Sequence, residues 1–355
     1  MSGSQRGSRA GAMRLALLAM EPFYAGAMLV RNKLYDKGML KTVKLARPVI
    51  SVGNLTTGGT GKTPMIRWLA NWLRDEGRRV AVLSRGYKAA EGQMGDEQIM
   101  LDHQLNGPGQ SMVIVRANPD RVAGAEAIIA KYPGINVILL DDAFQHRKVA
   151  RNFDIVLVSA LDPFGMGHVL PRGLMREPAR GLRRADAIVM THCEAVRTAT
   201  LDDVEKRIRM LNPKASIYRA THKQTGLRTT GAAASAPPDR TMKDLLAHQY
   251  YAFCGIGNPQ PLHRYLSSIG GNYVGHRWQP DHHIYRGREL ADLRADALAR
   301  DADLLITTEK DWVKIGQLPD AIIGNPPIWR LEVEMKLLND GDKQLTEQIR
   351  RAIAR

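Results

Sequence analysis

The sequence predicts an α/β protein with a mostly parallel sheet and helices on both faces, followed by a smaller second α/β domain. From Pro48 onward, short β-branched runs alternate with segments that have the apolar spacing of helices, the pattern of parallel strands joined by crossover helices. A stretch rich in Gly, Ala, Thr and Pro predicts a linker or exposed loop, and 355 residues suffice for about two domains. We expect an N-terminal amphipathic helix region at 1–35, a first α/β domain at 36–223, the linker at 224–240 and the smaller domain at 241–355.

Each expected element has its own local signal. Runs of apolar, β-branched residues predict strands in the first domain at 48–52, 80–84, 112–115, 137–140, 154–159 and 187–190. Apolar residues at helical spacing predict a helix over 62–76 and another over 119–131, the latter with Asn118 as its N-cap. The same signals in the smaller domain predict strands at 250–254 and 304–307 and helices at 259–268 and 288–300.

The N-terminal region combines an apolar stretch with basic flanks. Leu15 to Val30 is apolar, and Lys and Arg residues lie on both sides of it. Glu21 interrupts the run, which is shorter than the ~20 residues that a membrane span requires. We expect an interfacial helix with basic flanks that lies on an anionic leaflet. Two alternatives stay open: a signal peptide, since Ala25-Gly26-Ala27 resembles a cleavage site, and a helix packed on the protein's own core.

The charge balance favours an anionic partner. The chain has 51 Lys and Arg against 36 Asp and Glu, a net charge of +15, which favours nucleic acid, an anionic membrane surface or a phosphorylated substrate. Only 6% of residues are aromatic, which argues against a nucleic-acid stacking platform. We therefore expect no nucleic-acid partner, although a binding module with steeply salt-dependent affinity is an alternative. Cys193 and Cys254 are too few to frame a fold or a zinc site, which fits a reducing compartment.

A glycine-rich stretch between a predicted strand and a predicted helix indicates a phosphate-binding loop. Glycines let the backbone turn its N–H groups toward a phosphate, and the following helix N-terminus favours negative charge. Lys62 would reach the β- and γ-phosphates, and the Thr63 hydroxyl would contact Mg²⁺. Thr56 stands where the usual pattern begins with glycine. The residues expected to bind the nucleotide are Thr56, Thr57, Gly58, Gly59, Thr60, Gly61, Lys62 and Thr63.

Two further groups of polar residues could complete such a site. Asp141 and Asp142 end an apolar strand, and in a parallel sheet this places them near the phosphate loop, where a carboxylate can hold Mg²⁺. Asp96 follows a Gly-rich loop, and Asp281-His282-His283 lies in the second domain. A phosphoryl-transfer enzyme needs a carboxylate to orient or deprotonate the accepting hydroxyl, and a histidine can hold that carboxylate in position.

The combined pattern resembles the tetraacyldisaccharide 4′-kinases of lipid A synthesis, which are P-loop kinases. The motifs that carry the resemblance are Gly58-Gly59-Thr60-Gly61-Lys62-Thr63-Pro64, Ser84-Arg85-Gly86-Tyr87, Gly95-Asp96-Glu97, Asp141-Asp142 with Phe144-Gln145-His146, Arg176-Glu177-Pro178, Gly255-Ile256-Gly257-Asn258-Pro259, Asp281-His282-His283 and Thr307-Thr308-Glu309-Lys310-Asp311. The chain departs from the family pattern at Gln98, Ala143 and Thr191-His192.

The resemblance implies transfer of the ATP γ-phosphate to the 4′-hydroxyl of an acylated glucosamine disaccharide 1-phosphate. It also implies a peripheral position at the cytoplasmic face of a Gram-negative inner membrane. By position in the motifs, it implies that Lys62 and Thr63 bind phosphate and Mg²⁺, and that Asp96 is the catalytic carboxylate paired with His282. Asp141, Asp142 and Glu177 would surround the metal. No obligate protein partner is expected. The remaining alternative is a P-loop ATPase or GTPase acting as a switch or metallochaperone, although the sequence has no Asn-Lys-x-Asp base-reading motif.

Overall fold

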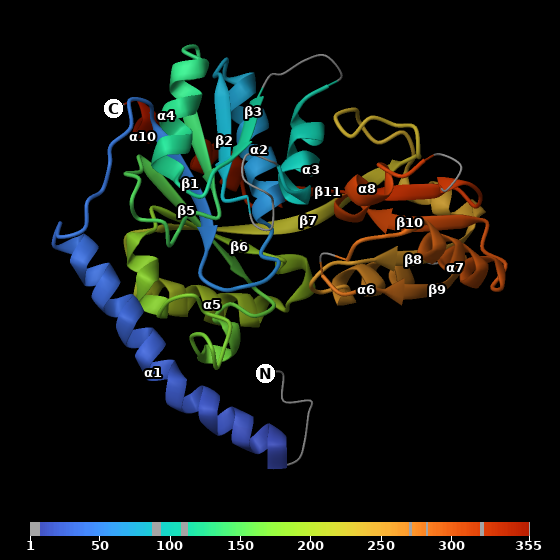
Figure 1. The fold of residues 1–355 in the computed structure, drawn as a ribbon, viewed down its shortest axis with the longest axis horizontal. Helices are drawn as coiled ribbons and strands as arrows, with labels where there is room; N and C mark the ends of the chain where they lie inside the picture. The colour runs from blue at the N-terminus through green and yellow to red at the C-terminus, as the bar shows by residue number, and fades with distance from the viewer. Residues whose placement is uncertain are drawn as a thin grey trace. The chain divides into compact units, whose positions relative to one another are not determined.

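The computed structural model describes residues 8–86, 94–107, 113–269, 272–281, 283–319 and 323–354 (Figure 1). The chain divides into two compact units. Unit 1 comprises Met1–Arg85, Arg116–His222 and Met335–Arg355, and unit 2 comprises Gly86–Val115 and Lys223–Glu334. The junction after His222 lies next to the expected boundary at 223. The other borders differ from the expected ranges, because Gly86–Val115 belongs to unit 2 and the C-terminal Met335–Arg355 returns to unit 1.

Unit 1 is built on a parallel sheet. Its strands are β1 (Val49–Asn54), β2 (Val80–Ser84), β4 (Val137–Asp141), β5 (Phe153–Ser159), β6 (Ala187–Thr191) and the first part of β7 (Ser216–Arg228). They pair in the order β2-β4-β1-β5-β6-β7, and every pair is parallel. β1 therefore lies inside the sheet, with all six of its residues buried. The mostly parallel sheet that the sequence predicts is confirmed. β3 (Val113–Ala117) spans the border between the units.

The helices of unit 1 are α1 (Ser8–Asp36), α2 (Lys62–Asp75), α4 (Arg121–Lys131), α5 (Thr198–Leu211) and α10 (Gly341–Ile353). α2 buries the predicted apolar stripe, which contains Ile66, Leu69, Ala70 and Leu73. The N-cap of α4 is Asp120 rather than the predicted Asn118. The Asp120 side chain accepts from the backbone N–H groups of Val122 and Ala123, whereas Asn118 accepts from the N–H of Asp120 and so holds the turn before the helix.

The N-terminal helix α1 lies on the outside of unit 1 (Figure 1). The helix is longer than the apolar run at 15–30 indicated, and by length and composition alone its part from Gly11 to Asp36 could cross a membrane. The predicted apolar helix is present, but its exposed apolar side chains do not form a single face. Met13 and Leu15 are both 67% exposed, although residues two apart point about 200° away from each other on a helix.

Unit 2 contains parallel strands, which pair in the order β11 (Ile328–Leu337), β10 (Leu304–Thr308), β8 (Gln249–Cys254) and β9 (Asn272–Trp278). The last residues of β11, from Met335 on, belong to unit 1. Its helices are α3 (Asp96–Leu105), α6 (Gln260–Ser268), α7 (Gly287–Leu298) and α8 (Glu309–Ile315). Consecutive residues of β8 belong to different cores. Tyr250 packs in the core that includes Leu266 of α6, and Tyr251 packs in the core that includes Leu293 of α7. Side chains on a strand alternate between faces, so both faces of this sheet are covered.

The segment expected to be a linker has more structure than its composition suggests. β7 continues to Arg228, and Arg228 is buried in ion pairs with Glu309 and Glu332. Its guanidinium also donates to the carbonyl of Ala236. A single arginine within a Gly-, Ala- and Thr-rich stretch thus ties the segment to unit 2.

Candidate functional site

The predicted phosphate loop connects buried β1 to the N-terminus of α2. Gly58 and Gly61 have left-handed backbone conformations, with φ of 108° and 84°, which glycine adopts without steric cost. A Cβ on Gly61 would lie 2.6 Å from Nε2 of His222. The loop therefore requires glycine at position 61 both for its backbone angle and for the space beside it.

Both ends of the loop are held by neighbouring elements. The amide of Asn54 donates to the Thr60 hydroxyl at 2.9 Å, and the Thr191 hydroxyl donates to the Thr60 carbonyl at 3.0 Å. At the other end, the N–H of Thr57 donates to the carbonyl of Leu174 at 2.7 Å. The predicted loop residues are thus fixed by the ends of β1 and β6 and by the segment at 174–176.

Lys62 and Asp142, predicted from separate motifs, lie together. The Lys62 ammonium is 3.7 Å from Oδ1 of Asp142, and the Arg176 guanidinium holds the same carboxylate with two bonds of 2.7 and 2.9 Å. Burial acts to raise the pKa of the Asp142 carboxyl, but the charges of Lys62 and Arg176 outweigh it, so this pKa is below its ordinary value. We call Thr56–Thr63, Asp141, Asp142 and Arg176 the phosphate-loop cluster.

Asp141 is the last residue of β4 and pairs in parallel register with Val52 of β1. The buried guanidinium of Arg121 donates to the Asp141 carbonyl at 3.0 Å. Burial lowers the pKa of Arg121 to about 10, although Asp141 and Asp142 partly offset this effect. Arg121 was not predicted from the sequence, because its position inside a helix gave no sign that its guanidinium would reach the end of β4. It supplies a further positive charge at this sheet edge.

Glu177, predicted to lie near the metal, is occupied by protein partners. It is fully buried and forms an ion pair with Arg184 at 2.8 Å. The amides of Gln145 and Asn32 donate to its two oxygens at 3.0 and 2.8 Å. Gln145 also donates to the carbonyl of Asn54. Glu177 therefore organises the residues beside the loop, and a direct metal contact would have to compete with the Arg184 pair.

Two histidines stack beside the loop. The rings of His192 and His222 lie 4.1 Å apart and 22° from parallel. Burial lowers the pKa of His192 to about 4 and that of His222 to about 3, so both are neutral near pH 7. The sequence marks His192 as a departure from the family pattern, whereas nothing near His222 in the chain indicates its contact with Gly61.

In unit 2, Asp96 lies in the first turn of α3. The N–H of Gly95 donates to the side chain of Gln98 at 2.9 Å, so Gln98, which departs from the family pattern, caps the helix start. Oδ2 of Asp96 is 3.7 Å from the ammonium of Lys314 on α8, and Glu97 is 3.8 Å from Lys310.

The same two lysines contact the segment at 281–283. Lys310 pairs with Asp281 at 2.8 Å, and Lys314 donates to the carbonyl of His283 at 2.9 Å. His282 itself lies outside the described residues, so its predicted pairing with Asp96 stays a prediction. We call Asp96, Glu97, Asp281, Lys310 and Lys314 the lysine–carboxylate cluster. Sequence reasoning noted the motif that contains Lys310 but assigned no role to either lysine.

Asp311 joins three segments that are far apart in the sequence. Its Oδ1 accepts from the N–H of Gly255 at 3.0 Å and from the Tyr285 hydroxyl at 3.2 Å. The Thr308 hydroxyl donates to its Oδ2 at 2.7 Å. Burial raises the pKa of Asp311 even though these bonds act to lower it. The buried carboxyl therefore holds the segments at Gly255 and Tyr285 next to the start of α8.

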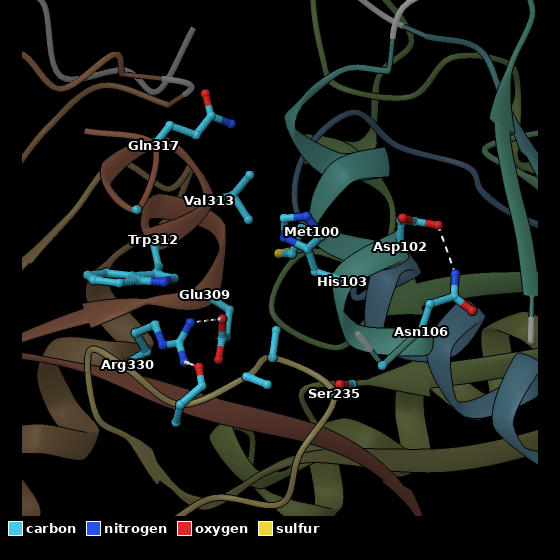
Figure 2. Close-up of a pocket in the computed structure, with 15 residues that line it drawn as sticks. Met100, Asp102, His103, Asn106, Ser235, Glu309, Trp312, Val313, Gln317 and Arg330 are labelled. Atoms are coloured by element: carbon cyan, nitrogen blue, oxygen red, sulfur yellow. Dashed lines mark hydrogen bonds and ion pairs between the residues drawn. The ribbon is translucent and has the colours of Figure 1, made fainter. Parts of the chain in front are cut away.

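A pocket of about 540 Å³ lies between α3, α8 and the loop at 232–235. Figure 2 shows Met100 and His103 of α3 on one side and Trp312 and Val313 of α8 on the other. α3 and α8 are thus joined by ion pairs at the start of α3 and leave a hollow further along. None of the predicted site residues that the structure describes lines this pocket.

Residues 13–354 match the model of the protein family described as tetraacyldisaccharide-1-P 4′-kinase. A tetraacyldisaccharide 4′-kinase of Syntrophus aciditrophicus is 36% identical over 339 residues, covering 91% of this chain and 89% of the relative. One from Anaeromyxobacter sp. strain K is 36% identical over 345 residues, with coverage of 92% and 87%. A crystal structure of LpxK from Aquifex aeolicus in complex with ATP is 28% identical, has a TM-score of 0.71 and covers 96% of this chain and 99% of that one.

Proposed function

Because the chain belongs to the tetraacyldisaccharide-1-P 4′-kinase family, we propose that it transfers the γ-phosphate of ATP to the 4′-hydroxyl of a tetraacylated glucosamine disaccharide 1-phosphate. The product is the 4′-phosphorylated lipid of lipid A biosynthesis, lipid IVA. The observation that carries this proposal is the phosphate-loop cluster. In it, a left-handed Gly61 precedes the N-terminus of α2, and Lys62 lies beside a carboxylate at the end of the neighbouring strand.

The phosphate loop binds the nucleotide phosphates through its backbone N–H groups and Lys62. Backbone N–H groups at a helix N-terminus and a lysine charge together stabilise negative charge on the phosphates. Arg176 lies next to Asp142 and adds a second cation at this edge. Because Arg176 already neutralises Asp142, Lys62 can move from Asp142 to a phosphate without leaving that carboxylate unpaired.

Thr63 with Asp141 or Asp142 fits a magnesium ion. In the part of the chain that the structure describes, no group of three or more His, Cys, Asp or Glu side chains could hold a metal. Mg²⁺ does not need one, because it usually takes one or two carboxylates together with substrate phosphates and water. The bound ion would counter the charge on the phosphates. Glu177 is paired with Arg184 and supports the loop through Gln145, and its contact with the ion stays a prediction.

Asp96 orients or deprotonates the accepting 4′-hydroxyl, and His282 supports it. Lys314 contacts both Asp96 and the carbonyl of His283, so it links the carboxylate to the segment that contains His282. The hydrogen bond from the N–H of Gly95 to the side chain of Gln98 fixes the turn that carries Asp96. A fixed carboxylate near the acceptor is what general-base assistance requires.

The acceptor is a lipid, and α1 provides the membrane contact. Phe23 is 80% exposed and Val30 is 58% exposed on a helix of 29 residues. Such apolar surface favours a lipid interface. We propose a peripheral position on the anionic, cytoplasmic face of the inner membrane, where ATP is available.

Incubation of the purified protein with radiolabelled ATP and acylated disaccharide 1-phosphate tests the function. We expect label in the lipid product and loss of this transfer in Lys62→Ala. ATP hydrolysis that is independent of the lipid would instead favour the ATPase switch. A disaccharide that already carries a 4′-phosphate is the matched control acceptor, and labelling of it at the wild-type rate would contradict the proposed position of transfer.

A further inference from the structure

Helix α1 carries a set of polar contacts on its inner side. Both carboxylate oxygens of Glu21 bind the loop after η1 (Gly165–Gly167): one accepts from the N–H of Val169 and lies 3.0 Å from Nδ1 of His168, and the other is 3.1 Å from Arg172. The charge that interrupts the apolar stretch therefore faces the protein's own loop.

Further along α1, two side chains reach the residues beside the phosphate loop. The Tyr24 hydroxyl donates to the carbonyl of Arg176 at 2.8 Å. The Asn32 amide donates to Oε2 of Glu177 at 2.8 Å. Two consecutive residues of the segment at 176–177 are thus held from α1.

That segment also holds the phosphate-loop cluster. The N–H of Arg176 donates to the carbonyl of Leu55 at 2.8 Å, and its guanidinium holds Asp142, which lies 3.7 Å from Lys62. A continuous series of contacts therefore runs from Tyr24 through Arg176 and Asp142 to Lys62.

The outer side of α1 has a different character. Glu21, Tyr24 and Asn32 fall within an arc of about 80° around the helix, as 3.6 residues per turn requires. Phe23 and Val30 point to the opposite side and are 80% and 58% exposed. At Phe23 and Val30 the helix thus presents apolar side chains outward, while Tyr24 and Asn32 bind the residues beside the phosphate loop inward.

We propose that Tyr24 and Asn32 are positioning residues for the nucleotide site, and that binding of the outer side of α1 to an anionic lipid surface stabilises their contacts with Arg176 and Glu177. This rests on the membrane contact in the proposed function and adds to it a coupling between that surface and ATP. The lipid surface favours the docked arrangement of α1, and this arrangement holds Asp142 where Lys62 and Arg176 meet. ATP therefore binds more tightly on the membrane, and by linkage the membrane binds more tightly with ATP.

The test measures binding rather than turnover. Wild-type protein, the inner-side variant Tyr24→Phe/Asn32→Ala and the outer-side control Phe23→Ser/Val30→Ser are each mixed with vesicles of phosphatidylglycerol and phosphatidylethanolamine that contain no acceptor. Sedimentation gives vesicle binding, and titration with a non-hydrolysable ATP analogue gives the Kd with and without vesicles.

We expect vesicles to lower the wild-type Kd for the analogue about 3- to 10-fold, the size of effect that one or two neutral hydrogen bonds produce. The inner-side variant keeps vesicle binding but loses this response, and the outer-side control loses vesicle binding while its Kd without vesicles stays at the wild-type value. Equal Kd values and equal vesicle responses in the wild type and the inner-side variant would overturn the coupling. If the wild type does not sediment with vesicles, the proposed binding of α1 to a lipid surface is wrong. A failed kinase assay, in contrast, would leave these binding results intact.

Thermal melts check that each variant folds. If the double substitution lowers the melting temperature markedly, Tyr24→Phe alone replaces it, because it removes only one oxygen atom. Its expected change in Kd is about half of the double variant's on a logarithmic scale. No change in Kd for Tyr24→Phe would likewise count against the proposal.

Discussion

The phosphate-loop cluster in unit 1 and the lysine–carboxylate cluster in unit 2 are assembled in different ways. In the first, most of the chemistry comes from one uninterrupted stretch, Thr56–Thr63, and from the adjacent pair Asp141 and Asp142. In the second, Asp96 is held by Lys314, more than two hundred positions further along the chain. A phosphate loop needs consecutive backbone N–H groups, whereas a carboxylate can be positioned by charges from any part of the chain. The first type of cluster is therefore visible in a sequence, and the second becomes visible only in the fold.

The largest effect is expected at Asp96. Asp96→Ala should lower turnover by about 10² to 10⁴-fold, the usual range for a general base, and leave the Kd for ATP nearly unchanged. Rates with saturating acceptor and a binding titration measure the two effects. If His282 acts with Asp96 as one unit, the double variant Asp96→Ala/His282→Ala should lose far less turnover than the product of the fold-losses of the two single variants. Asp102→Asn on the same helix is the control and should retain the wild-type rate.

Lys62→Ala should have the next largest effect, about 10² to 10³-fold in turnover, because it removes a cation that stabilises charge developing on the phosphate. Unlike Asp96→Ala, it should also weaken ATP binding. Lys206→Ala, at a side chain that is 76% exposed on α5, serves as control. Wild-type turnover in correctly folded Lys62→Ala would remove the basis for assigning the reaction to this loop.

A smaller effect is expected at Lys314. Lys314→Met removes the contacts with Asp96 and with the His283 carbonyl while keeping much of the side-chain volume. We expect a loss of about 10-fold in turnover, because a misplaced catalytic group slows the reaction without abolishing it. The KM for ATP should not change. Lys343→Met, at a side chain that is 79% exposed, is the control. An unchanged rate would mean that α8 does not position Asp96.

The smallest effect concerns the stability of unit 1 in mild acid. The pKa of His222 falls from an ordinary 6.5 to about 3 on folding, mainly through burial, with His192 adding to the shift. Glu194 also faces this ring, at 3.9 Å. Below pH 6.5 the unfolded chain takes up a proton that folded His222 does not, so stability is full above pH 6.5 and declines as the pH falls toward 3.

For His222 alone this decline amounts to at most about 2 kcal/mol at pH 5. The free energy of unfolding of His222→Gln should therefore fall less steeply between pH 7 and pH 5 than that of the wild type. Denaturant titrations at a series of pH values measure this slope. Parallel slopes for the two proteins would show that His222 is not buried in its neutral form.

The contrast between the two clusters also explains what could be predicted from the sequence. The strands of unit 1 other than β7, and the placement of Lys62 beside Asp142, follow from local patterns and from the rule that parallel strands end at one sheet edge. Glu177 was assigned to the metal by motif position, but its burial with Arg184 depends on packing that no motif records. Asn118 and Asp120 are both good caps, and only the backbone geometry decides between them. Strand β7 was missed because its second half has the composition of a loop.

The ion pairs of Arg228 have a practical consequence for handling the protein. The stretch at 229–241 has the composition of a site where a tag, a protease cleavage site or a new chain end would normally be tolerated. However, Arg228 holds the carbonyl of Ala236, and Arg330 donates to the carbonyl of Ala232. An insertion between these two alanines would disturb the segment whose carbonyls accept from two buried guanidinium groups, so it should destabilise unit 2. An epitope tag is better placed directly after Gly77, which is exposed and has no heavy atom within 4 Å of the position a Cβ would take.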